Sequence, residues 1–254
     1  MIIDTHMHIG PMAKQYVCDY SVERLVEWMD EAGITKCINP NVWGLTAGEY
    51  EYAFAYGHQT WEDTDHRIYA YHVYDPRRSE ECLKLMEQYR KDPAYVGIKI
   101  HPADHKTAPE DESYRPMWDF AREHHLPVMA HTWDLTPNPK QVYAIPTRFE
   151  KYIAEYQDVT VTLGHSGGRP GGMRLAAEMG KKYKNMYFDT AGDIWPNGFL
   201  EFMVSQVGAD HMLFSSDYAM MDFRLMKGVV IGADLTEEEK ECIFYKNAQR
   251  IYHI

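Results

Sequence analysis

The sequence is poor in several features that mark particular classes of protein. Its 26 lysine and arginine residues stand against 38 acidic ones, a formal net charge of −12. This deficit of positive charge argues against a nucleic acid as partner, because affinity for a phosphate backbone depends on Lys and Arg. No apolar run approaches the roughly 20 residues that a membrane span requires. A basic signal region is also missing at the N-terminus, where Asp4, His6 and His8 interrupt the apolar start.

Cysteine is scarce as well, and its four positions stand far apart with no paired spacing: Cys18, Cys37, Cys82 and Cys242. This usage fits the reduced thiols of a cytoplasmic protein better than a disulfide framework or a cysteine-based zinc site. Hydrophobic residues make up 45% of the chain and aromatic ones 13%, enough for a sizeable core. We therefore expect a soluble, cytoplasmic protein that acts on a small molecule and has no membrane partner. An aromatic-rich stretch over 50–61 could form a homo-oligomer interface, although the buried face of an outer helix is the alternative.

Short apolar runs alternate with longer amphipathic ones along the whole chain. The apolar runs predict strands over 1–9, 34–39, 67–74, 95–101, 127–131, 159–165, 186–190 and 212–217. The amphipathic runs predict helices over 22–32, 47–64, 79–89, 113–124, 146–156, 173–183, 198–207 and 236–251, the first capped by Ser21 and the third by Ser79.

Eight strands that alternate with helices predict an α/β fold, a single (β/α)8 barrel (TIM barrel) that fills one domain over residues 1–254. No Gly/Ser-rich linker marks a second domain. An open, doubly wound sheet is the alternative, but no Gly-x-Gly-x-x-Gly turn follows the first strand.

Residues able to bind a metal or move a proton recur at the ends of the predicted strands. His6 and His8 lie two residues apart, so a strand would present both on one face. The later strand ends add Lys99, His101, His131, His165 and Asp217. Each histidine alone could simply cap a strand carbonyl. In a (β/α)8 barrel, however, catalytic residues lie at the C-terminal ends of the strands, so we expect this set to converge on one site.

The donor types indicate which ion such a site would bind. Three imidazoles and a carboxylate without a thiolate suit one divalent ion, Zn²⁺ first, with Mn²⁺, Fe²⁺ or Co²⁺ as alternatives. A catalytic ion of this kind leaves a position for water and lowers the pKa of that water toward roughly 7. The resulting hydroxide would attack a carbonyl or imine carbon, while an unligated His or Asp moves the proton.

Seven segments of the chain form a recognisable pattern: Ile3–His8, Gly97–Pro102, Ala130–His131, Gly164–Gly168, Phe188–Thr190, Ser215–Tyr218 and the C-terminal Asn247–Ile251. They resemble the amidohydrolase superfamily, in particular its "amidohydrolase 2" branch, which includes aminocarboxymuconate-semialdehyde decarboxylase-like enzymes. The resemblance implies that the metal ligands are His6, His8, His131 and Asp217. It also implies that His165 orients or deprotonates the metal-bound water and that Asp217 shares this catalytic proton transfer.

Strand four departs from the pattern of two-metal family members, which often carry a bridging carboxylated lysine at its end. Here the strand ends in His101, and Lys99 lies two residues earlier. We interpret Lys99 as a buried cation paired with a carboxylate such as Asp4 or Asp189. His101 is then expected to contact the substrate rather than the metal.

Two further residues are candidates for substrate binding. Arg169, in a glycine-rich loop after strand six, could clamp a substrate carboxylate with its planar fork, although a solvent-facing arginine is the alternative. Trp133, after strand five, could wall the pocket, as could Trp195 and Tyr218, although aromatic residues at such positions more often serve packing.

The sequence therefore predicts a metal-dependent hydrolase, in which a metal-bound hydroxide attacks a small carboxylate-bearing lactone, amide or related substrate. The alternative at the same site is a non-oxidative, metal-dependent decarboxylase of an aromatic or enoic acid. There, the metal anchors the substrate and proton transfer replaces hydrolysis. A barrel without catalysis, which keeps its histidines as structure, is disfavoured because the full ligand set is present.

Overall fold

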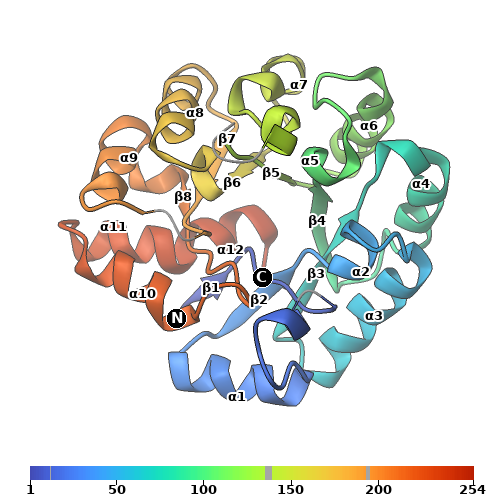
Figure 1. The fold of residues 1–254 in the computed structure, drawn as a ribbon, viewed down its shortest axis with the longest axis horizontal. Helices are drawn as coiled ribbons and strands as arrows, with labels where there is room; N and C mark the ends of the chain where they lie inside the picture. The colour runs from blue at the N-terminus through green and yellow to red at the C-terminus, as the bar shows by residue number, and fades with distance from the viewer. Residues whose placement is uncertain (12, 135–138, 193–194) are drawn as a thin grey trace.

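The computed structural model describes residues 1–11, 13–134, 139–192 and 195–254, and eight parallel strands lie in sequence order around a barrel (Figure 1). They are β1 (Ile3–Asp4), β2 (Lys36–Asn39), β3 (Ile68–Val73), β4 (Tyr95–Ile100), β5 (Val128–His131), β6 (Val161–Gly164), β7 (Met186–Asp189) and β8 (Met212–Leu213). Backbone hydrogen bonds just beyond β1 and β8 complete the ring. The Thr5 N–H donates to the Phe214 carbonyl (3.0 Å), and the Asp217 N–H donates to the His6 carbonyl (2.9 Å). The predicted (β/α)8 barrel is confirmed.

Helices form the outer ring and short turns connect them. The α-helices are α1 (Val22–Ala32), α2 (Val42–Leu45), α3 (Tyr50–Asp63), α4 (Ser79–Gln88), α5 (Pro102–His105), α6 (Arg115–Glu123), α7 (Glu150–Glu155), α8 (Pro170–Lys182), α9 (Phe199–Val207), α10 (Phe223–Gly232), α11 (Glu237–Glu241) and α12 (Asn247–Tyr252). The 3-10 turns are η1 (Ala13–Gln15), η2 (Pro76–Arg78), η3 (Glu112–Tyr114), η4 (Pro139–Tyr143), η5 (Pro146–Phe149), η6 (His165–Gly167) and η7 (Ala209–His211), and a π-helical turn, η8 (Cys242–Lys246), joins α11 to α12. Among the described helices, none combines the length and the hydrophobicity needed to cross a bilayer.

The first and last strands are shorter than predicted. β1 ends at Asp4 and β8 at Leu213, so His6, His8 and Asp217 lie in the segments that follow the strands. The polar residues of these segments are held by bonds across the barrel instead of by the sheet ladder, which is why an apolar pattern alone overestimates the strand length.

Helix starts were predicted with mixed success. Ser21 caps α1 as predicted, since its side chain accepts a hydrogen bond from the Arg24 N–H. Ser79, in contrast, is the first residue of α4 and not its cap, because the 3-10 turn η2 already bends the chain before it. Helix α10 is absent from the prediction. Leu225 and Ile231 of this helix are exposed, so its apolar residues do not follow the regular spacing from which a helix is predicted.

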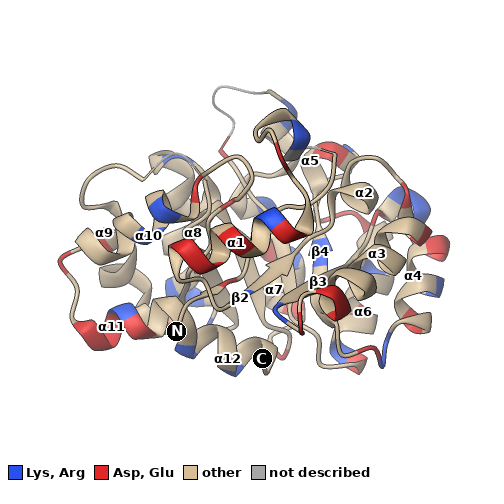
Figure 2. Ribbon diagram, turned by 90° about the horizontal axis from the view of Figure 1, so that it is seen from below, with Lys and Arg blue, Asp and Glu red and all other residues tan. Residues whose placement is uncertain are grey.

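The barrel interior is closed at its N-terminal end by the last helix. Tyr252 of α12 reaches into an interior apolar cluster that includes Tyr71 and Met129. The Tyr71 hydroxyl donates to the Thr5 carbonyl (2.9 Å) and lies 2.8 Å from the Tyr252 hydroxyl. Figure 2 shows α12 at the bottom of the barrel and α5 at the opposite end. The C-terminal ends of the strands are therefore the face left for a ligand.

One histidine is buried in the apolar layer between strands and helices. His72 of β3 stacks on Tyr95 with a centroid distance of 4.5 Å, and neither of its ring nitrogens has a hydrogen-bond partner among the described residues. Burial, with a smaller effect of His124, lowers the pKa of His72 to about 3. The folded chain therefore cannot take up the proton that this imidazole accepts in the unfolded chain below a pH of about 6.5.

We expect His72→Leu to make the fold less sensitive to acid. Between pH 7 and pH 5 the unfolded His72 gains a proton that the folded one refuses, so this group lowers the free energy of unfolding by ~2 kcal/mol. The variant lacks that loss, and urea denaturation at both pH values measures it. His253→Asn is the control, because His253 is exposed and its φ of 57° suits asparagine. An equal loss of stability in His72→Leu and in the unmodified chain would contradict the prediction.

Candidate functional site

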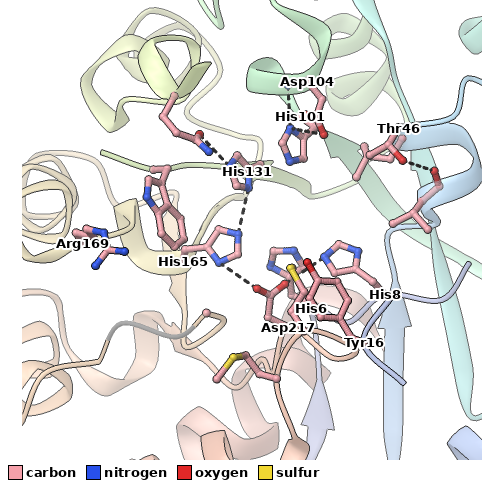
Figure 3. Close-up of a pocket in the computed structure, with 17 residues that line it drawn as sticks. His6, His8, Tyr16, Thr46, His101, Asp104, His131, His165, Arg169 and Asp217 are labelled. Carbon is pink, nitrogen blue, oxygen red and sulfur yellow. Dashed lines mark hydrogen bonds and ion pairs between the residues drawn. The ribbon is translucent and has the colours of Figure 1, made fainter. Parts of the chain in front are cut away.

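A cavity of about 480 Å³ lies at the C-terminal ends of the strands (Figure 3). It is lined by side chains from the segments that follow most of the strands. The residues predicted to bind metal, move the proton or bind substrate are among them, namely His6, His8, His101, His131, Trp133, His165, Arg169 and Asp217, whereas Lys99, Trp195 and Tyr218 are not. Residues spread over more than 200 positions of the chain thus meet in one place.

Three buried residues bring potential metal ligands closest together. One ring nitrogen each of His6 and His165 and one carboxylate oxygen of Asp217 lie within 4.8 Å of one another, and we call these three residues the donor group. His8 adjoins this group, since its Nε2 lies 3.2 Å from Asp217 Oδ1.

The donor group and His8 fit a divalent ion. Two buried ring nitrogens, His165 Nδ1 and His8 Nδ1, have no hydrogen-bond partner within the described ranges. A buried lone pair without a proton donor is costly, and a cation beside the Asp217 carboxylate would satisfy that of His165 Nδ1, whereas the His8 nitrogen that faces Asp217 is Nε2. Neutral imidazole and carboxylate are also the ligand types that Zn²⁺ and Mn²⁺ accept.

His131 contacts the donor group through His165. Its Nδ1 is 3.1 Å from His165 Nε2, and its Nε2 is 3.2 Å from Gln141 Oε1. The structure therefore groups His165, predicted as a residue that does not bind the metal, with His6 and Asp217. It places His131, predicted as a ligand, in contact with His165. The ligand set His6, His8, His131 and Asp217 stays a prediction.

A buried ionic network lies against the donor group. His6 is held on both sides, with Asp189 Oδ2 2.8 Å from its Nδ1 and Lys99 Nζ 2.9 Å from its Nε2. Burial lowers the pKa of Lys99 to about 8 and raises that of Asp189 to about 6. Lys99 is buried, as predicted, and Asp189 is one of the carboxylates that attract it, although its direct contact is with the His6 ring. The Asp4 carboxylate instead accepts the backbone N–H of His6 (3.1 Å), and Asp189 is taken by the His6 ring.

Burial also sets the protonation states of the site. It lowers the pKa values of His6, His8 and His131 below their ordinary range, so these imidazoles are neutral and keep a lone pair. Burial alone would raise the pKa of Asp217, but His165 and His8 outweigh it and hold that pKa below its usual value. A neutral imidazole set beside an ionised carboxylate is the form that binds a cation.

A flat wall of rings borders the cavity. The His101 and His131 rings stack at 3.9 Å with an angle of 10°, and Trp133 is parallel to His131 within 3° at 6.3 Å. We call these three residues the planar wall. Arg169, half-buried, lies on the other side of His165 from Asp217 in Figure 3.

Two of the aromatic residues considered for the pocket serve packing instead. The Trp195 indole N–H donates to the Thr190 carbonyl (2.8 Å). Tyr218 stacks on Phe223 at 4.7 Å, beside a separate cavity of about 350 Å³.

The sequence prediction missed four polar or aromatic residues that line the cavity, namely Tyr16, Thr46, Asp104 and Gln141. None of them ends a strand, so the rule that located the histidines does not reach them. Asp104 follows His101 by three residues at the start of a short helix, and this spacing is the one local signal that could have indicated it.

The chain matches a known protein family. The model of the amidohydrolase 2 family, described as Amidohydrolase, matches residues 3–254. The predicted resemblance is thereby confirmed. A search of curated proteins finds no match.

Several solved structures have a similar fold. One is 2,6-dihydroxybenzoate decarboxylase in complex with 2,6-dihydroxybenzoate, with 15% identity, a TM-score of 0.80, and coverage of 100% of this chain and 99% of that chain. A second is a dihydroxybenzoic acid decarboxylase from Polaromonas sp. JS666 with bound manganese and the inhibitor 2-nitroresorcinol. It has 17% identity, a TM-score of 0.77, and coverage of 99% of this chain and 96% of that chain. A third is 4-oxalomesaconate hydratase from Rhodopseudomonas palustris, with 18% identity, a TM-score of 0.74, and coverage of 100% of this chain and 96% of that chain. At these identities, the likeness supports the fold alone.

We expect Asp189→Ala to destabilise the fold strongly. The carboxylate accepts the His165 N–H (2.6 Å) and contacts the His6 ring, so its removal leaves buried donors unpaired. The free energy of unfolding should fall by ~3 kcal/mol or more, and by less in Asp189→Asn, which keeps one acceptor. Urea denaturation measures the change. Asp158→Ala is the control, because its ion pair with Arg122 is exposed and should contribute under about 1 kcal/mol. A cost for Asp189→Ala no larger than that of the control would show that the network is dispensable.

Proposed function

We propose a reaction for this chain, which belongs to the amidohydrolase family and is an enzyme of that metal-dependent superfamily. The reaction is the non-oxidative decarboxylation of a small aromatic or enoic acid. Hydrolysis, which the sequence placed first, becomes the second candidate. The described cavity supports both reactions. We place decarboxylation first because two of the similar structures are decarboxylases named for aromatic acids.

One observation carries the proposal: the donor group shares a single cavity with the planar wall and with Arg169. The three rings lie in parallel planes, so a flat acid could stack on an exposed ring face, where stacking favours planar substrates. The Arg169 guanidinium offers a bidentate fork for a substrate carboxylate. The two decarboxylases described above are named for dihydroxybenzoates, and the hydratase is named for oxalomesaconate. Each of these is a small, carboxylate-bearing molecule.

The residues of the chain divide the task. A divalent cation bound by His6, His8 and Asp217 would supply Lewis acidity, with Zn²⁺ and Mn²⁺ both suited to these ligands. His165 would then hold and deliver the proton, since its Nδ1 lies 3.9 Å from Asp217 Oδ2 and has no hydrogen-bond partner among the described residues. When the bond to the carboxylate breaks, its electron pair stays on the substrate carbon, which takes that proton as CO₂ leaves. The planar wall fixes the ring so that this carbon faces His165.

One specific observation also supports hydrolysis as the second candidate. His165 Nδ1 has no hydrogen-bond partner among the described residues and lies beside the donor group. Its lone pair could equally take a proton from water in an attack on a lactone or amide. The products therefore separate the two candidates, because decarboxylation releases CO₂ and hydrolysis adds water.

We expect the purified chain to bind about one divalent ion and to release CO₂ from a hydroxybenzoate such as 2,6-dihydroxybenzoate. Elemental analysis gives the ion content, and a coupled CO₂ assay gives the rate. Removing the ion with a chelator should lower turnover at least ~100-fold, and Mn²⁺ or Zn²⁺ should restore it. Asp217→Asn, which changes a proposed ligand beside His165, should lose activity while the circular dichroism spectrum stays unchanged.

Three results would count against this function. A chain that takes up neither Zn²⁺ nor Mn²⁺ would remove the metal-dependent mechanism. Full turnover in Asp217→Asn would remove the proposed role of that residue. Hydrolysis of lactones or amides without any CO₂ release from aromatic or enoic acids would reverse the order of the two candidates.

We expect Arg169→Met to raise the KM for a carboxylate substrate at least ~10-fold with a smaller change in kcat. The variant keeps the length of the side chain and loses its charge-assisted hydrogen bonds, which contribute roughly 1.5–3 kcal/mol. Arg174→Met is the matched control, because Arg174 lies on the same helix region and packs over Phe199 outside the cavity. Equal KM values for the two variants would place Arg169 outside the substrate site.

A further inference from the structure

Gln141 contacts His131, the histidine that lies behind the donor group. It belongs to η4, the turn that follows β5, and its Oε1 lies 3.2 Å from His131 Nε2. The other ring nitrogen of His131 lies 3.1 Å from His165 Nε2. Gln141, His131 and His165 thus form one chain of contacts that ends at the donor group, and Figure 3 shows its dashed lines meeting at His131.

Backbone bonds fix Gln141 relative to the end of β5. The Trp133 N–H donates to the Ala144 carbonyl (2.9 Å), and the Ala144 N–H donates to the Gln141 carbonyl (2.8 Å). Arg148 adds a bond from its Nη1 to the Val142 carbonyl (2.9 Å). The turn is therefore anchored two residues after His131, and the carboxamide reaches the His131 ring from a defined position.

The carboxamide oxygen decides which nitrogen of His131 carries the proton. A neutral imidazole has one N–H, so the partner of one ring nitrogen sets the state of the other. Because Gln141 Oε1 can only accept, His131 Nε2 must carry the proton, and His131 Nδ1 then holds a lone pair. His165 Nε2 can donate to that lone pair, which leaves a lone pair on His165 Nδ1.

The far end of this chain agrees with that assignment. His165 Nδ1 is a buried atom without a hydrogen-bond partner among the described residues. Asp217 Oδ2 lies 3.9 Å away, beyond hydrogen-bonding distance, and so does not require a proton on that nitrogen. The lone pair therefore faces the point where the donor group converges.

We propose that Gln141 is a positioning residue that holds His131 as the Nε2–H tautomer and so directs a lone pair of the histidine chain toward the divalent-ion site. The inference rests on the proposed function, in which this site binds a divalent ion. The second nitrogen of a metal-binding histidine is commonly paired with an oxygen acceptor, which fixes the tautomer and the ring orientation. Gln141 fills that place directly if His131 provides the ligand, and acts through His131 if His165 does.

Two variants of Gln141 separate its acceptor from its volume. Gln141→Leu keeps a similar size and loses the oxygen, whereas Gln141→Glu keeps an acceptor at the same reach. Gln157→Leu is the matched control, because Gln157 is exposed and its side-chain amide donates to the nearby Ala154 carbonyl (3.1 Å). Urea denaturation of all three confirms that they fold.

The first measurement is the tautomer of His131 in metal-free protein. In ¹⁵N-histidine-labelled protein at pH 7.5, the ring signals, assigned by their loss in His131→Asn, should show the Nε2–H form in the unmodified chain and in Gln141→Glu. Gln141→Leu should show a mixture of both tautomers. An Nδ1–H form in the unmodified chain, or no change in Gln141→Leu, would overturn the proposal.

The second measurement is the Kd for Mn²⁺, from competition with a chelator. We expect Gln141→Leu to weaken binding ~10–100-fold, and Gln141→Glu and Gln157→Leu to stay within about 2-fold of the unmodified chain or, for Gln141→Glu, to bind more tightly. Unchanged binding in Gln141→Leu would overturn the role of Gln141. If the unmodified chain binds neither Mn²⁺ nor Zn²⁺, the proposed function fails, and the tautomer measurement still decides on Gln141.

Discussion

The site depends on the backbone bond from the Asp217 N–H to the His6 carbonyl (2.9 Å), which joins the segments after the first and last strands. This bond and the neighbouring bond between Thr5 and Phe214 complete the barrel where β1 and β8 have ended. Two members of the donor group come from these segments. The contact that completes the ring therefore also sets the distance between the imidazole and the carboxylate. A change that opens this seam would disperse the donor group before it disturbed the outer helices.

The sequence was sufficient to predict the barrel and the strand-end histidines of the cavity, because both follow from periodicity. Apolar runs of strand length recur eight times, and parallel strands bring their C-terminal ends to one face, so His101, His131 and His165 had to meet. The same reasoning could not give the contacts within the cavity. Lys99 reaches His6 instead of a carboxylate, because the Asp4 carboxylate is taken by backbone N–H groups, a competition invisible in the sequence.

Gln141 shows a second limit of periodicity. The strand rule ends with His131, and the turn η4 that carries Gln141 has no apolar repeat from which its path can be inferred. Its position depends on the bonds of Trp133 and Ala144, which join two points of the same loop. Strand-end residues are thus predictable from pattern, whereas the residues that orient them depend on the path of the loops.

His6 shows how the metal-free network and a bound ion must compete. Its Nδ1 contacts the Asp189 carboxylate and so carries the proton, which leaves the lone pair on Nε2. That lone pair is the one the Lys99 ammonium contacts at 2.9 Å. A divalent ion bound through the same nitrogen would therefore displace the ammonium, and repulsion between two cations would drive Lys99 toward the carboxylates of Asp189 and Asp217, which already attract it. Lys99 thus balances the charge of the buried carboxylates, and an ion at His6 Nε2 would have to displace it.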